Sequence, residues 1–438
     1  MTSKKDIDQI AKDLIMTESA EKKQKITNQI QAMAKEKGIF LASIHDLYKA
    51  VGEGKVSGFT VPAINLRNLT YYLARAIFRV AKKNNAGAFI FEIAKSEMGY
   101  TDQPPMEYTG VILAAAIKEE YSGPVFIQGD HFQLNAKMFA VDREKEVNGL
   151  KHLIDDAVGA GFLNIDIDSS TVVDLERKEI LEQQRDNFEV CAELTKYIRK
   201  VQPEGIVVSV GGEIGEVGGK NSNIKELKAY MDGYLDSLPP GMEGISKISV
   251  QTGTSHGGVV LPDGSIAQVK VDFDVLKNLA KYGRENYHLG GTVQHGASTL
   301  PPAAFGKLPD NETLEVHLAT NFQNMMFDST IFPKELKDKM YAWLKKNCAK
   351  EMKDGQTEDQ FIYKTRKKAL GPFKREIMEL PEEIKEGIAQ EIESKFDFLF
   401  KQLRVNDTKK TVEDFIQPKD FKLGIKSSKA VLDGEGDD

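Results

Sequence analysis

Four residues of types that bind metal ions stand at the ends of four apolar stretches of this sequence. His131 follows the run Val-Phe-Ile-Gln-Gly-Asp, and Glu213, His256 and His295 also come after apolar runs and beside glycines. Short apolar runs that end at glycine are typical of buried strands. Three imidazoles and one carboxylate suit zinc or a similar divalent ion, with one coordination position left for a substrate. Because the carboxyl ends of barrel strands meet at one mouth, we expect a shared metal site there.

Asp130 lies directly before the first of these histidines and is a candidate proton carrier. The alternative is that it only orients a neighbouring group, as carboxylates beside metal ligands do. A lone histidine is more often structural than a ligand, so the metal-site prediction depends on the whole set. The other histidines are expected on the surface or in the core, and the last of them lies near the end of a strand: His45, His152, His288 and His317.

Glycine-rich loops lie beside two of the candidate ligands. The segments 253–258 and 296–299 place backbone N–H groups and hydroxyls next to His256 and His295. Such loops cradle phosphate, especially after the seventh and eighth strands of a barrel. The alternative is that they are tight turns required by the fold. A metal beside a phosphate cradle favours chemistry on a phosphorylated carbonyl compound, through an enediolate.

Strands and helices alternate in the part of the chain that carries these residues. Eight strand candidates fall between about 55 and 330, close to the ~250 residues of an α/β fold of the (β/α)8 barrel type. A doubly wound open sheet is the structural alternative. The strands are expected at 59–64, 86–92, 124–128, 162–168, 205–210, 247–250, 287–293 and 314–318, with helices that include 40–52, 171–201 and 273–283.

The segments outside the barrel are helical in pattern. We expect an N-terminal helical extension over 1–52, the barrel over 53–330, a C-terminal helical extension over 331–425 and a disordered acidic tail over 426–438. The C-terminal helices are rich in charged residues and also carry apolar residues at helical spacing. They are therefore expected to pack on the barrel or on a second subunit.

Composition narrows the classes of function. The chain has 59 basic and 66 acidic residues and a net charge of −7, which argues against a general nucleic-acid surface. The two cysteines make no disulfide framework, which indicates a reducing compartment. No apolar run approaches the ~20 residues of a membrane span, and the charged N-terminus is unlike a secretory signal. We therefore expect a cytoplasmic protein with no membrane or nucleic-acid partner.

Five motifs, taken together and in order, resemble those of the class II, metal-dependent fructose-bisphosphate aldolases. The similarity spans about 40–320 and extends more weakly to 375. The motifs are Gly129-Asp130-His131, the segment 164–170, Glu213-Ile214-Gly215 with Gly218-Gly219, the segment 253–257 and His295-Gly296-Ala297-Ser298.

The resemblance implies roles at the metal centre. His131, His256 and His295 would bind the catalytic zinc, although cobalt, iron or manganese can share such ligands. Glu213 and Asp168 would belong to a second or alternative metal position nearby. Asp130 would move the proton of the C4 oxygen during carbon–carbon cleavage.

The resemblance also implies substrate contacts. A monovalent cation and the residues Gly257, Gly296 and Ser298 would hold the phosphate of the dihydroxyacetone phosphate half. Asn65 and Thr320 would contact substrate, and Arg366 would reach the other phosphate, often across a homodimer.

Two segments depart from the family pattern. The family usually has an acidic residue after the loop's glycine pair, but this chain has Asn221, so Glu216 is the nearest candidate base and Glu226 a more distant one. The last strand ends in His317-Leu318-Ala319-Thr320 where the family commonly has Asn-x-Asp-Thr. Asp166 also stands where an apolar residue is usual.

The leading interpretation is a zinc-dependent aldolase that reversibly cleaves a ketose bisphosphate. Fructose 1,6-bisphosphate is the default substrate, which would give dihydroxyacetone phosphate and glyceraldehyde 3-phosphate. The alternatives are an aldolase for tagatose 1,6-bisphosphate or another ketose phosphate, a barrel that binds sugar phosphate without catalysis, and an isomerase or epimerase with related enediolate chemistry.

Overall fold

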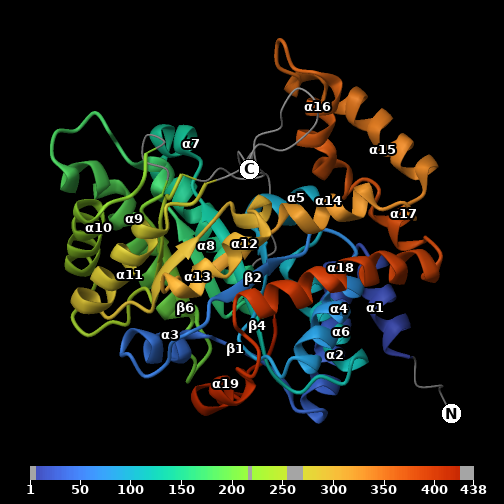
Figure 1. Cartoon of the computed structure of the whole chain (residues 1–438), viewed down its shortest axis with the longest axis horizontal. Helices are drawn as coiled ribbons and strands as arrows, with labels where there is room; N and C mark the ends of the chain where they lie inside the picture. Colours follow the sequence, from blue (N-terminus) through green and yellow to red (C-terminus); the bar gives the residue numbers. More distant parts are fainter. Residues whose placement is uncertain (1–5, 216–219, 254–269, 425–438) are drawn as a thin grey trace.

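A closed barrel of parallel strands forms the centre of the computed structural model, which describes residues 6–215, 220–253 and 270–424 (Figure 1). In this part of the chain nine strands form one parallel sheet in the order β1-β4-β3-β2-β9-β8-β7-β6-β5, and β4 also pairs with β5. That last pairing closes a ring of eight strands, so the (β/α)8 barrel is confirmed and the open sheet is excluded. The barrel strands are β2 (Val61–Asn65), β3 (Ile90–Ala94), β4 (Gly123–Gln133), β5 (Asn164–Asp168), β6 (Ser209–Glu213), β7 (Lys247–Ser249), β8 (Gly291–Gln294) and β9 (Glu315–Leu318).

The ninth strand, β1 (Ile39–Ala42), lies outside the ring and pairs with the first residues of β4. The side chain of Asn164 joins the two strands: its amide donates to the carbonyl of Ile127 at 2.9 Å and its oxygen accepts from the N–H of Ile44 at 2.9 Å. The prediction of one helix over 40–52 is therefore wrong in its first part, since only α3 (His45–Gly52) is helical.

Helices cover the outside of the barrel. The long helices that follow the barrel strands are α4 (Thr70–Lys83), α6 (Pro105–Lys118), α8 (Arg143–Gly159), α9 (Ile180–Val201), α10 (Ile224–Asp236), α11 (Phe273–Tyr287) and α14 (Thr320–Asp328), and the short ones are α5 (Lys95–Tyr100), α7 (Ala136–Val141), α12 (Pro302–Phe305) and α13 (Lys307–Asp310). Several predicted boundaries are wrong, and the strands expected at 86–92 and 205–210 begin at Ile90 and Ser209. The helix expected from 171 begins at Ile180, and the strand expected from 287 begins at Gly291, because His288 ends α11 in the left-handed conformation with φ 56°.

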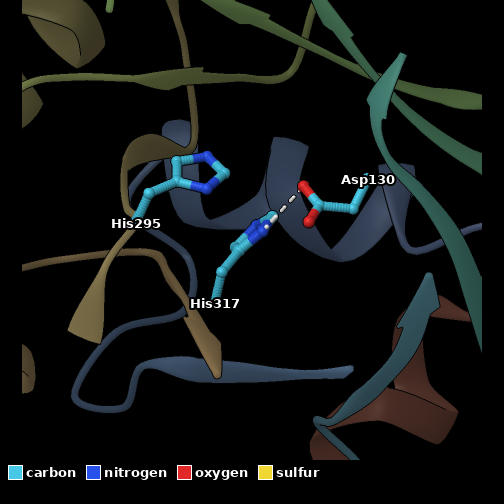
Figure 2. A group of neighbouring side chains, drawn as sticks. All are labelled: Asp130, His295 and His317. Carbon is cyan, nitrogen blue, oxygen red and sulfur yellow. Dashed lines mark hydrogen bonds and ion pairs between the residues drawn. The ribbon is translucent and has the colours of Figure 1, made fainter. Parts of the chain in front are cut away.

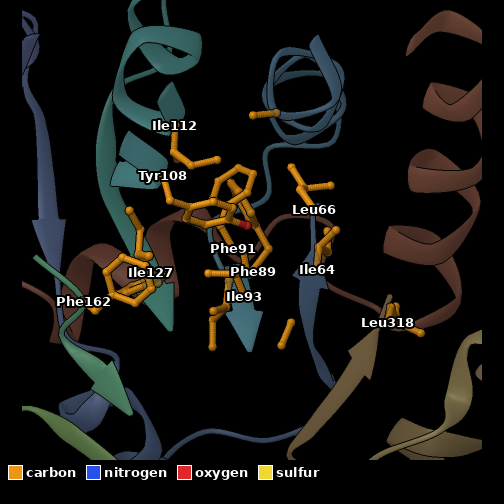
Figure 3. Packing of buried hydrophobic residues seen from close by; sticks show 14 of the residues in the cluster. Ile64, Leu66, Phe89, Phe91, Ile93, Tyr108, Ile112, Ile127, Phe162 and Leu318 are labelled. Atoms are coloured by element: carbon orange, nitrogen blue, oxygen red, sulfur yellow. The ribbon is translucent and has the colours of Figure 1, made fainter. Parts of the chain in front are cut away.

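The apolar core fills the layer between the strands and the helices (Figure 3). Phe91 and Ile93 of β3 are fully buried, and so are Tyr108 and Ile112 of α6. Both faces of each barrel strand are covered, one by helices and one by the barrel interior. This explains why even the polar residues of these strands are buried.

Both helical extensions pack on the barrel helices. The N-terminal helices α1 (Ile7–Met16) and α2 (Ala20–Glu36) contact α6, and α18 (Glu382–Gln402) lies along α4 (Figure 1). The buried side of α18 includes Ile388, Ile392 and Phe396, whose spacing of four residues places them on one face. The other C-terminal helices are α15 (Lys334–Asn347), α16 (Glu358–Thr365), α17 (Lys374–Met378) and α19 (Lys409–Phe415).

The expected acidic tail, 426–438, lies outside the described residues. Among the helices that the structure describes, none has the length and the apolar character needed to cross a bilayer.

Candidate active site

The carboxyl ends of the barrel strands bring together most of the residues singled out in the sequence. Asp130 and His131 lie in β4, Asp168 ends β5, Glu213 ends β6 and His295 follows β8. The rings of His131 and His295 are 4.3 Å apart between centroids. Residues from four different strands thus meet at one mouth, as the barrel geometry requires.

A bulge in β4 aims two neighbouring side chains into the site. The register of β4 against β5 shifts between Gly129 and Phe132, and His131 has a φ of 41°, which is uncommon for a residue other than glycine. A β-carbon at Gly129 would collide with the ring of Phe132, so this position needs glycine. In a regular strand Asp130 and His131 would point to opposite faces, whereas here both face carboxylates or imidazoles of the mouth.

Two neighbouring groups of side chains offer metal-ligand atoms. His131 Nδ1 lies 3.2 Å from Asp168 Oδ2 and 3.8 Å from Glu213 Oε2, and one ligand atom from each of the three residues falls within 4.8 Å of the others. Asp130, His295 and His317 form a second such group (Figure 2). Imidazole and carboxylate donors at this spacing fit a divalent ion such as zinc.

Opposite charges at the mouth shift the pKa values of neighbouring side chains. Burial alone would lower the pKa of His131, but Asp130, Asp168 and Glu213 raise it well above its usual range. Burial would raise the pKa of Asp130, but His131 and His317 hold it well below its usual value. Burial would raise the pKa of Asp168, but the His131 imidazole lowers it, and so do hydrogen bonds from Ser170 and Gln133, each at 2.7 Å. These carboxylates are therefore ionised and favour a cation.

Beneath the mouth lies a set of charged and polar residues for which the sequence alone predicted no role in the site. We call it the interior charge cluster, and it consists of Glu92, Gln128, Asp166, Lys247 and Glu315, all buried. Lys247 Nζ donates to Gln128 Oε1 at 2.7 Å and to Asp166 Oδ2 at 2.9 Å, and it also donates to Glu315. Barrel interiors are usually filled by branched apolar side chains, so this polar interior is unusual.

His317 connects the mouth to the interior charge cluster. Its Nδ1 lies 3.1 Å from Asp130 Oδ1, and its Nε2 lies 2.6 Å from Glu315 Oε1. From the sequence, His317 was expected on the surface or in the core. The signal that could have found it is its spacing of two from Glu315 in β9, which puts both side chains on the same face of that strand.

The expected substrate-binding residues are distributed around the mouth. Asn65 donates to Glu97, and the hydroxyl of Ser298 accepts from the N–H of Ala319 at 2.8 Å. Gly296 has a φ of 65° at the start of the turn after His295, and Thr320 begins α14.

Arg366 lies in the C-terminal extension, and its guanidinium donates to Asn324 at 2.6 Å and to Asp328 at 2.9 Å within the same chain. Glu226, the more distant candidate base, instead caps α10 by accepting from the N–H of Asn223 at 3.0 Å. Glu216, His256 and Gly257 lie outside the described residues.

Comparisons with known proteins agree with this architecture. The family described as "Fructose-bisphosphate aldolase class-II" matches residues 45–391. A probable tagatose 6 phosphate kinase from Sinorhizobium meliloti 1021 shares the fold, with a TM-score of 0.55, 13% identity and coverage of 81% of this chain and 99% of that chain. A fructose-bisphosphate aldolase from Campylobacter jejuni matches with a TM-score of 0.46 and 15% identity over 84% of this chain and 96% of that chain. No curated protein sequence matches the chain. Since the family match covers most of its length, this chain belongs to the class II fructose-bisphosphate aldolase family.

Proposed function

We propose that the protein is a zinc-dependent aldolase that reversibly cleaves a ketose bisphosphate. The observation that carries this proposal is the convergence of His131, His295, Asp168 and Glu213 on one buried mouth, with Asp130 beside them. A family with metal-dependent members supports the same chemistry. Fructose 1,6-bisphosphate is the first substrate to test, and tagatose 1,6-bisphosphate or another ketose phosphate is the alternative.

His131 and His295 would hold the divalent ion, with Asp168 and Glu213 as ligands at a second or alternative position and His256 as the further histidine that the resemblance implies. When bound, such an ion polarises the C2 carbonyl of the substrate and so stabilises the charge that develops there. Zinc is the ion we propose, and cobalt, iron and manganese are the alternatives that share its ligands.

The residues of the chain supply the proton transfers. Asp130 is ionised and would accept the proton of the C4 hydroxyl. The C3–C4 bond then breaks, C4 becomes an aldehyde, and the bonding electron pair moves toward the polarised carbonyl. A proton is returned to C3, for which Glu216 is the candidate donor. Asp130 then loses its proton to solvent, and Glu216 regains one from solvent. The sum of these steps neither adds nor removes atoms, as cleavage to an aldehyde and dihydroxyacetone phosphate requires.

The glycine-rich turn at Gly296 and Ser298 would bind the phosphate of the dihydroxyacetone phosphate half, with a monovalent cation beside it. Arg366 is held by Asn324 and Asp328 of its own chain, so its proposed contact with the other phosphate needs these bonds to be exchanged. A homodimer in the cytoplasm remains the assembly and location that we propose.

The test is a coupled assay for the release of dihydroxyacetone phosphate. We expect cleavage of fructose 1,6-bisphosphate that disappears with a chelator and returns with zinc. A zinc-loaded protein that cleaves none of a panel of ketose phosphates would contradict the proposal. Binding without turnover would then favour a non-catalytic sugar-phosphate barrel, and an isomeric sugar without cleavage would favour an isomerase or epimerase.

A further inference from the structure

His317 occupies the centre of the barrel, where the mouth meets the interior charge cluster. Figure 2 shows its ring between His295 and Asp130, and the centroids of the two imidazole rings are 4.1 Å apart. The side chain of His317 is 5% exposed and that of Asp130 is 6% exposed. A histidine at this place replaces the asparagine that is common in the family, so its contacts bear directly on how this chain differs.

Both ring nitrogens of His317 face carboxylates. Nδ1 lies 3.1 Å from Asp130 Oδ1 and 3.1 Å from Glu92 Oε2, while Nε2 lies 2.6 Å from Glu315 Oε1. A ring nitrogen that donates a proton to a carboxylate has no lone pair left for a metal ion. His317 therefore differs in role from the proposed metal ligands His131 and His295, although its ring lies beside one of them.

The carboxylate of Glu315 is itself held in place by hydrogen bonds. Its carboxylate accepts from the ammonium of Lys247, from the phenol of Tyr48 and, at 3.0 Å, from the amide of Gln128. Glu315 and Lys247 are fully buried. A carboxylate held by three donors in a packed interior has little freedom to move, so it fixes the orientation of the imidazole above it.

We propose that His317, oriented by Glu315, is a positioning residue that holds the Asp130 carboxylate where it can take the proton of the C4 hydroxyl. The arrangement is an acid–imidazole–acid chain in which the lower carboxylate orients the ring and the ring orients the upper carboxylate, in the same way that a third group orients a catalytic base. This inference rests on the proposed function, because it assigns Asp130 its reaction. A displacement of about 1 Å at a reacting group can cost ~10²-fold in rate.

The test compares three replacements of His317 in the full-length, zinc-loaded protein. In His317→Asn the side-chain amide can replace the Nδ1 donor to Asp130. In His317→Gln the amide matches the Nε2 position instead, and His317→Leu replaces neither. We expect kcat for cleavage to fall by about 10–100-fold in the Gln and Leu variants and by clearly less in the Asn variant, with KM within about twofold of the wild type.

A second readout separates positioning from general damage. Exchange of the C3 proton of dihydroxyacetone phosphate with deuterated solvent does not involve the C4 oxygen, so all three variants should keep it at the wild-type rate. His288→Asn is the matched control, since His288 is exposed and already has a left-handed φ that asparagine tolerates. Metal content and the thermal midpoint verify that each variant is folded.

The outcomes are distinguishable. A His317→Leu variant that is folded and cleaves at the wild-type rate overturns the inference alone. Equal losses of cleavage and exchange in all three variants, Asn included, also overturn it, because they indicate a structural role. A wild-type protein that neither cleaves ketose phosphates nor exchanges the proton overturns the proposed function, and the inference falls with it.

Discussion

At the scale of single residues, the role of Asp130 distinguishes the proposed aldolase from a barrel that binds sugar phosphate without catalysis. It lies between His131 on its own strand and His317 on β9, and these imidazoles keep its carboxylate ionised. A barrel that only binds sugar phosphate would have no need for an ionised, buried carboxylate at this place. The role of Asp130 can therefore be tested independently of the identity of the sugar.

We expect Asp130→Asn to lower kcat for cleavage by about 10²–10⁴-fold, because the amide cannot accept the C4 proton. Zinc content should stay unchanged, since the ion is proposed at His131 and His295 and not at the neighbouring group of Asp130, His295 and His317. The measurement is steady-state cleavage together with metal analysis. Asp46→Asn, an exposed change on α3, is the control and should leave both values unchanged. A variant that keeps more than about a tenth of the rate would show that another group carries this proton.

The sequence predicted the outer part of the site better than its centre. The convergence of His131, Glu213 and His295 could be predicted because each stands at the end of an apolar run, where barrel strands end, whereas Asp168 was implied only by the family resemblance. His317 was not assigned to the site, although it lies near the end of β9, because a lone histidine is more often structural than a ligand. The bulge that aims both Asp130 and His131 inward is a property of the pairing with β5 and has no local sequence signal beyond Gly129.

At the scale of elements, α18 is fixed to the barrel by polar contacts at the edge of its apolar face. Asp397 on α18 accepts from Asn84 at 2.7 Å and from Lys83 at 3.1 Å, both at the end of α4. Arg79 on α4 forms an ion pair with Glu393 on α18 at 2.7 Å. The C-terminal extension is thus part of the layer that covers the barrel.

We expect Asp397→Asn to lower the free energy of unfolding at pH 7 by about 1 kcal/mol, a value that allows for screening at a partly exposed site. Burial alone would raise the pKa of Asp397, but bonds from Asn84, Lys401 and Lys83 lower it to about 2. Because the folded pKa lies below the unfolded one, this stabilisation is fully present above about pH 4 and is lost as the pH falls toward 2.

The measurement is the thermal midpoint of both proteins between pH 7 and pH 3. The difference between variant and wild type should shrink as the pH falls below about 4. Asp414→Asn is the matched control, because Asp414 forms a pair with Lys410 within one exposed helix and should contribute little. A constant difference at every pH would mean that the charge of Asp397 does not carry the effect.

Helices and strands with a long sequence pattern were predicted well, whereas those whose position depends on a tertiary contact were predicted poorly. The alternation of strands and helices predicted the barrel, and α11 begins at Phe273 as expected, although it extends to Tyr287 and not to 283. The short strand β1 was missed because four residues carry little pattern, and its place is fixed by Asn164, far along the chain. Pairing between distant segments is a property that no local window contains.

At the scale of the whole molecule, the proposed metal site joins distant parts of the barrel. His131 comes from β4, Asp168 from β5, Glu213 from β6 and His295 from the end of β8. The Asp168 and Glu213 carboxylates repel each other, and the His131 imidazole beside them balances part of their negative charge. The closed ring of strands holds them together, and an ion bound among them would in turn stabilise the ring.

We therefore expect a chelator to lower the thermal midpoint of unfolding, and zinc to restore it. A ligand that binds only the folded protein stabilises it by about 2.7 kcal/mol at 100 times its dissociation constant, so the shift should grow with zinc concentration. His131→Ala should remove this dependence, while His152→Ala, an exposed change on α8, should keep it. A midpoint that does not respond to zinc in the wild type would mean that the strands converge without binding an ion, and the His131 imidazole would then be the charge that balances the carboxylates. If zinc raises the thermal midpoint of the wild type and His131→Ala abolishes this response, the ion binds at the mouth. The same bound ion would then both stabilise the barrel and polarise the substrate.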